Sequence, residues 1–174
     1  MKNLRKAWNT RKFTNALYDG DWYTVDKMLD KDISMRAIDE GLQYMAYRGA
    51  TQTLEKSLNK GANLHYNDNM PLISAAHKNH LDAVEILISR GALSSAQNSL
   101  SLMFSIQNNN KKMALALVKS GANLHNAKEC FLRKVSREDD TPKNRSKNEE
   151  IYKRFKNWEN ELSLPPKTPT PPTP

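Results

Sequence analysis

The sequence predicts an all-α protein, a helical solenoid of four to five stacked repeats joined by short turns. One short phrase recurs at a fixed step of 30 residues, in the segments Gly61-Ala62-Asn63-Leu64-His65, Gly91-Ala92-Leu93-Ser94 and Gly121-Ala122-Asn123-Leu124-His125. Apolar residues between these segments recur at helical spacing. A fixed period of this size indicates stacked repeats rather than a single globular core.

The clearest unit runs from Met70 to Gly91. Pro71 suits the first turn of a helix because its missing N–H has no partner there. Asn79 is expected to break the unit into two helices, and Gly91 to end the second one in the left-handed conformation. The apolar positions expected to face the core are Leu72, Ala75, Ala76, Val84, Leu87 and Ile88.

The same pattern recurs before and after this unit. The expected break positions Gly20, Gly49, Asn79 and Asn109 are 29, 30 and 30 residues apart. An N-terminal cap is expected from Leu4 to Leu17, with Trp8 and Phe13 buried. A fifth unit begins within residues 126–137 but has no second helix of repeat type. The array with its cap is therefore assigned to residues 1–137.

These features resemble those of ankyrin-repeat proteins, in which a turn and two antiparallel helices form each unit. The resemblance is carried by Pro71-Leu72, Ala75-Ala76, Asn79-His80, Val84, Leu87-Ile88 and Gly91-Ala92. The usual ankyrin period is about 33 residues, and the step of 30 here places the loss in the turns between units. Such short fingers resemble those of ankyrin arrays of large DNA viruses and some phages.

Three further segments follow the array. Residues 138–148 are expected to form a linker, because Asp, Asn, Ser and Pro are frequent there. Residues 149–162 predict an amphipathic helix with Ile151, Phe155, Trp158 and Leu162 on one stripe. This helix either caps the stack or binds a partner, and the cap is preferred because an exposed aromatic stripe favours aggregation. Residues 163–174, rich in Pro and Thr, are expected to be disordered.

The sequence contains no motif that indicates catalysis, a metal site or a cofactor. It has neither a glycine-rich phosphate loop nor a nucleophile elbow. His77 and His80 lack further ligands nearby, and the resemblance implies that His80 serves the hydrogen bonds between repeats. The single cysteine, Cys130, lies in an apolar stretch and is expected to be an inert thiol. The expectation is a binding protein without enzymatic activity.

Charge and hydropathy indicate the expected location of the protein and the classes of partner that it could bind. No apolar run reaches the about 18 residues that a membrane span requires, and no secretory leader is expected. We therefore expect a cytoplasmic monomer, or a protein of the host cytoplasm if the source is viral. The net charge is +8, and the first twelve residues contain five basic side chains and no acid. Nucleic-acid binding through the basic termini is therefore the alternative to protein binding.

The residues expected to contact a partner protein follow from the resemblance. In ankyrin-repeat proteins, the two positions after the Ala-Ala pair and the finger residues face the partner on the concave side. The corresponding residues here are Tyr18, Asp19, Tyr47, Arg48, His77, Lys78, Gln107 and Asn108, and the fingers add Tyr66, Asn67 and Asn69. Tyr and Arg often dominate binding energy at interfaces, so Tyr18, Tyr47, Arg48 and Tyr66 lead this set.

Overall fold

The computed structural model describes residues 2–137 and 141–162, and in these residues the chain forms ten helices and no strand. This confirms the all-α prediction. The helices are α1 (Lys2–Asp19), α2 (Trp22–Leu29), α3 (Met35–Arg48), α4 (Thr51–Asn59), α5 (Tyr66–His77), α6 (Leu81–Ser89), α7 (Ala96–Gln107), α8 (Lys111–Lys119), α9 (Leu124–Val135) and α10 (Pro142–Leu162).

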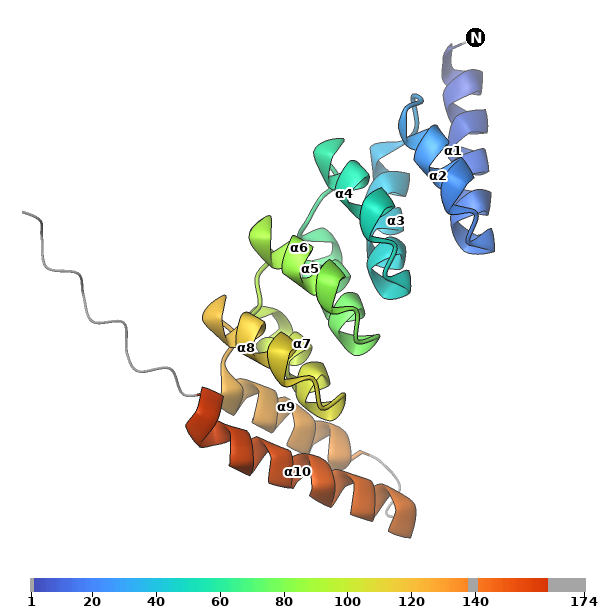
Figure 1. Ribbon diagram of the computed structural model, residues 1–174. Coiled ribbons are helices and arrows are strands. Elements are labelled where there is room, and N and C mark those ends of the chain that lie inside the picture. Colours follow the sequence, from blue (N-terminus) through green and yellow to red (C-terminus); the bar gives the residue numbers. More distant parts are fainter. Residues whose placement is uncertain (1, 138–140, 163–174) are drawn as a thin grey trace, which may run out of the picture.

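The helices stack as pairs along one axis (Figure 1). The odd-numbered helices α1, α3, α5, α7 and α9 each pack against the next and form one row, while α2, α4, α6 and α8 form the second. Core positions recur at the repeat step: Leu42, Leu72 and Leu102 are each at most 1% exposed. The 30-residue step therefore places equivalent buried leucines in α3, α5 and α7.

The predicted break positions are confirmed as the turns between paired helices. Gly20, Gly49, Asn79 and Asn109 all have positive φ, of 74°, 68°, 63° and 55°. Asn occupies the left-handed region more readily than other residues with a Cβ. Gly49 has a second constraint, because a Cβ there would lie 2.6 Å from Nδ1 of His80.

The expected N-terminal cap is wrong in one respect. Phe13 is fully buried, but Trp8 is 61% exposed and Leu4 is 77% exposed. Every residue from Lys2 to Trp8 is exposed, because no helix packs over the first two turns of α1. Helix α1 is the first helix of the first unit, and its second half is the part that packs.

One hydrogen bond recurs between consecutive units near the start of each odd-numbered helix. A side-chain oxygen accepts the backbone N–H found 24 residues later. We call this set the acceptor ladder. Its members are Thr10 Oγ1 with Ser34 (3.0 Å), Asp39 Oδ1 with Asn63 (2.7 Å), Asn69 Oδ1 with Leu93 (2.9 Å), and Ser99 Oγ with Asn123 (2.8 Å).

Two members of the acceptor ladder lie in unusual backbone. Residues 67–69 and the repeat-equivalent residues 97–99 each form one left-handed turn, with φ between 47° and 62°. Each non-glycine residue in this conformation costs about 1–2 kcal/mol. The turn brings the Asn69 and Ser99 side chains to the next unit, and the hydrogen bonds that they accept there offset part of this cost.

A second set of hydrogen bonds joins the units at the opposite ends of the odd-numbered helices. The carbonyls of Tyr47, His77 and Gln107, 30 residues apart, each contact a side-chain nitrogen of a following element. We call this set the donor ladder. The contacts are His80 Nε2 to Tyr47 O (3.1 Å), Asn108 Nδ2 to His77 O (3.3 Å), and Arg154 Nη1 to Gln107 O (2.9 Å). The expected role of His80 between repeats is confirmed by its contact.

Helix α10 lies along α9 and also contacts α7 and α8 (Figure 1). The stripe of Ile151, Phe155, Trp158 and Leu162 is at most 8% exposed, and the Phe155 ring stacks on Phe131 at 5.5 Å. The expected linker at 138–148 is wrong in its extent, because the helix begins at Pro142. Pro suits a first helical turn, and the Thr141 hydroxyl accepts the Asn144 N–H. Residues 138–140 and the expected tail at 163–174 lie outside the described part.

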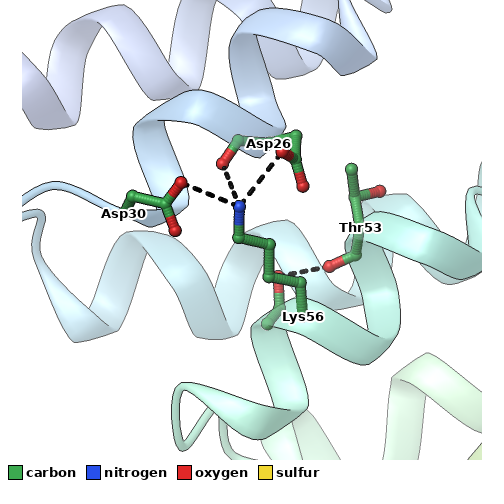
Figure 2. Close-up of polar contacts among 5 residues, drawn as sticks. Asp26, Asp30, Thr53 and Lys56 are labelled. Atoms are coloured by element: carbon green, nitrogen blue, oxygen red, sulfur yellow. Dashed lines mark hydrogen bonds and ion pairs between the residues drawn. The ribbon is translucent and has the colours of Figure 1, made fainter.

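The even-numbered row is joined by an ion-pair cluster between α2 and α4. Lys56 Nζ donates to the Asp26 carbonyl at 2.9 Å and to carboxylate oxygens of Asp26 and Asp30, each at 3.0 Å (Figure 2). Desolvation opposes the charged form of Lys56, but the bonds to Asp30 and Asp26 raise its pKa above the usual value. This cluster joins two repeats and is assigned a structural role.

The acceptor ladder predicts that Asn69→Ala destabilises the protein by about 1–3 kcal/mol more than Asn67→Ala, because the Leu93 N–H loses its partner. The two sites are matched in backbone conformation, because φ is 48° at Asn67 and 62° at Asn69. They differ in burial, since Asn67 is exposed and Asn69 is buried. Urea denaturation followed by circular dichroism measures the difference. Equal midpoints for the two variants would show that the ladder does not stabilise the stack.

Candidate functional site

Four tyrosines line a groove on the odd-numbered row. They are Tyr18 of α1, Tyr44 and Tyr47 of α3, and Tyr66 of α5. The groove has a volume of about 500 Å³, and its floor and walls also include Leu17, Ala37, Glu40, Gly41 and Gln43. Three of the four leading predicted residues, Tyr18, Tyr47 and Tyr66, therefore come together at one place. We call this feature the tyrosine groove.

The rings of the groove contact one another in sequence. Tyr18 meets Tyr44 edge-on with ring centroids 5.5 Å apart, and Tyr44 stacks near Tyr47 at 6.3 Å. These distances fall in the favourable range for aromatic pairs. Tyr18 remains 66% exposed and Tyr47 38% exposed, so both present ring surface and hydroxyl groups to solvent.

Two cations lie on this aromatic surface. The Arg48 guanidinium is 5.9 Å from the Tyr44 ring centroid, and Lys78 Nζ is 4.5 Å from that of Tyr47. A cation over an aromatic face is stabilised by the ring quadrupole. Both residues belong to the predicted set, and the structure places them at the edge of the tyrosine groove.

The other predicted residues are not part of the groove. The prediction that Asn69 faces a partner is wrong, because it is 2% exposed and its Oδ1 accepts the Leu93 N–H. Asn108 is exposed, but its Nδ2 donates to the carbonyls of Ala76 and His77. The Gln107 carbonyl is bound by Arg154. Asp19 and Asn67 are exposed without lining the groove.

The predicted set omits seven of the lining residues, and three of these carry large polar or aromatic side chains: Glu40, Gln43 and Tyr44. The signal for them was present, because residues three and four positions apart share one face of a helix. Tyr44 and Tyr47 are separated by three residues, and Glu40 and Tyr44 by four. The resemblance points only to the two positions after the Ala pair and to the fingers, and Glu40, Gln43 and Tyr44 lie at neither.

His77 lies beyond the groove and packs on Phe104, with ring centroids 4.6 Å apart. Partial burial, together with the positive charges of Lys78 and Lys134, lowers the pKa of His77 below its usual value. The two lysines therefore make the local potential positive.

A larger hollow of about 660 Å³ lies between α9 and α10, lined in part by Phe131, Leu132, Val135 and Tyr152. It contains none of the predicted binding residues. The tyrosine groove is the better candidate, because it combines apolar rings with hydroxyl groups and two cations.

The described residues show no arrangement that suggests catalysis. Within residues 2–137 and 141–162, no group of three or more His, Cys, Asp or Glu side chains could hold a metal ion. No helix in the same ranges combines the length and apolar character needed to cross a bilayer. The fold defines a repeat protein, and the groove is its candidate binding surface.

Comparison with known proteins identifies the kind of repeat. The model of a family described as "Ankyrin repeats (3 copies)" matches residues 42–128. The chain belongs to the ankyrin-repeat family. A protein of Acanthamoeba polyphaga mimivirus whose name describes it as an ankyrin repeat protein is 25% identical over 118 residues, 68% of this chain. The match covers 25% of that relative's length. Ankyrin repeats are generally modules for protein–protein interaction.

The environment of His77 predicts that Lys78→Gln raises the pKa of His77. Removing a nearby positive charge favours the imidazolium form. NMR titration of the imidazole signals measures the change, with His77→Gln used to assign the resonance. Lys119→Gln, an exposed change on α8, should leave the pKa of His77 where it was. A pKa unaffected by Lys78→Gln would show that the lysine does not act on the ring.

Proposed function

We propose that this protein is a non-enzymatic interaction module that binds a partner protein through the tyrosine groove. The observation that carries the proposal is the convergence of Tyr18, Tyr44, Tyr47 and Tyr66 from three helices on one groove. Tyr supplies a large, rigid contact area and a hydroxyl group at low entropic cost. The contiguous, partly exposed rings suit the centre of a protein interface.

We further propose a viral setting, with the partner a host protein of the cytoplasm that this module engages or inhibits. Two observations support this. The repeat step is 30 residues, and the connections 60–65 and 90–95 between units contain no strand. The relative that matches 68% of the chain comes from a virus of amoebae.

Nucleic-acid binding is the second candidate, and one observation favours it. Trp8 is 61% exposed, and Lys12 Nζ lies 5.3 Å from its ring. Exposed aromatic rings among cations are typical of surfaces that bind single strands. The described part of α1 offers one ring with a cation over it, whereas the groove holds four tyrosine rings, two of them with cations over them. We therefore prefer the protein partner.

Site-specific photo-crosslinking tests the groove. A photoreactive phenylalanine analogue replaces Tyr47 in the groove or, as a control, Tyr23 on α2, which is 69% exposed. The full chain is expressed in amoebae, irradiated and analysed by mass spectrometry. We expect a discrete host protein crosslinked from position 47 and absent from position 23. Tyr44→Ala in the position-47 chain should abolish that product while the circular dichroism spectrum stays helical.

Two results would contradict this function. One is a partner crosslinked equally from both positions, which would place the contact outside the groove. The other is submicromolar binding of a labelled 20-nucleotide RNA or DNA at physiological salt, abolished by Trp8→Ala. Non-specific binding to phosphates weakens steeply with salt. Tight binding that persists at physiological salt and depends on Trp8 would therefore make α1 the functional surface.

We also propose that α10 caps the array instead of binding the partner. The buried stripe and the Arg154 contact to the α7 carbonyls support this role.

If α10 is a cap, Phe155→Ala should destabilise the protein by about 3–5 kcal/mol, as expected for a fully buried aromatic side chain. Asn157→Ala, an exposed change in the same turn, should have little effect. Urea denaturation compares the two variants. An unchanged midpoint for Phe155→Ala would show that the stripe does not pack on the array, and would favour a partner-binding helix.

A further inference from the structure

We infer that the segment of the partner seated in the tyrosine groove is acidic, with Asp or Glu carboxylates contacting Arg48 and Lys78. This inference rests on the proposed function of the groove and adds the chemistry of the ligand. It is carried by two cations that lie on the groove's aromatic rings and that, in the described part of the chain, contact no carboxylate.

Arg48 and Lys78 lie over aromatic rings, whereas several other cations of the molecule form ion pairs. Lys6, Lys56, Lys111 and Lys112 each form an ion pair with a carboxylate of another segment. Within the described residues, Arg48 and Lys78 contact aromatic rings and no carboxylate. A cation held over a ring keeps donors directed at solvent, so both can accept a carboxylate without first breaking an internal pair.

Among the described residues, the one acid that lines the groove is Glu40, and it has a cationic partner on its own helix. Glu40 Oε1 accepts a hydrogen bond from Arg36 Nε at 3.0 Å, and the two form an ion pair along α3. The charge presented around the rings is therefore positive. Lys134 adds to the positive potential near His77, and the lowered pKa of His77 is consistent with that potential.

The positions of the cations relative to the rings indicate which kind of peptide segment fits the tyrosine groove. Arg48 lies over Tyr44 and Lys78 over Tyr47, and these two rings stack on each other. The cations therefore flank a continuous aromatic surface. A segment with apolar or aromatic side chains on the rings and carboxylates on either side matches this arrangement in both polarity and charge.

Selection from a randomised library tests the inference with the full-length protein. Twelve-residue peptides displayed on phage are selected on the wild-type chain and counter-selected on the Tyr44→Ala/Tyr47→Ala variant. We expect enriched peptides with an excess of Asp and Glu. The strongest peptide is then synthesised with a fluorescent label, and its affinity is measured by anisotropy.

Charge reversal provides the matched comparison. Arg48→Glu/Lys78→Glu should weaken the acidic peptide by at least about tenfold, since two ion pairs become repulsions. Lys12→Glu/Lys27→Glu makes the same change in net charge at two other cations that lie over rings, those of Trp8 and Tyr23. This control should change the affinity by less than about threefold, because neither residue lines the groove and exposed charges without a direct contact are screened. Circular dichroism verifies that both variants remain helical.

The outcomes separate the two proposals. Neutral or basic peptides that still require Tyr44 and Tyr47 would overturn the acidic chemistry and leave the groove as the binding site. Peptides that bind the tyrosine variant as well as the wild type would overturn the groove itself. Equal loss of affinity in both charge-reversal variants would show a non-specific response to net charge. Failure to enrich any peptide would count against both proposals.

Discussion

The structure depends on side chains that satisfy backbone groups of the neighbouring repeat. The acceptor ladder joins the units at one end of the odd-numbered helices, and the donor ladder joins them at the other. Backbone groups at helix ends and turns have no partner within their own helix. Each unit thus supplies what its neighbour lacks, and in the described residues no buried side-chain nitrogen or oxygen is without a partner. A repeat of another length would shift these groups out of reach, so the ladders and the core together select the 30-residue step.

The tyrosine groove is a consequence of this register. Tyr18, Tyr44 and Tyr66 belong to α1, α3 and α5. They line one groove because these helices pack side by side. The ladders also decide which polar residues remain available. Asn69 and Asn108 were attractive candidates for binding, yet their side chains are used between units. Tyr47 shows both roles in one residue, since its carbonyl joins the donor ladder while its ring faces the groove.

The sequence was informative wherever a single residue type serves one local purpose. Gly20 and Gly49 mark turns because they tolerate positive φ, and the predicted core residues Leu72, Val84 and Leu87 are each at most 1% exposed. It was less informative where neighbours decide the outcome. Thr10, Asp39, Asn69 and Ser99 are four residue types that accept the same hydrogen bond, so a search by residue identity does not find them. Trp8 was expected to be buried on hydrophobicity alone, but burial requires a helix to pack on it, and none does.

The contacts of Arg154 show how α10 joins the end of the array. The carbonyls of Ala76 and His77 are bound by Asn108 of the next unit, and 30 residues later those of Ile106 and Gln107 are bound by Arg154. A residue of α10 therefore takes the place of a repeat residue, although α10 has no repeat sequence. The position of Gln107 corresponds to those of Tyr47 and His77, so α10 contacts the face that the groove uses in earlier units. A partner that binds this face as we propose would therefore contact α1, α3 and α5, where the rings lie, with Arg48 and Lys78 beside them.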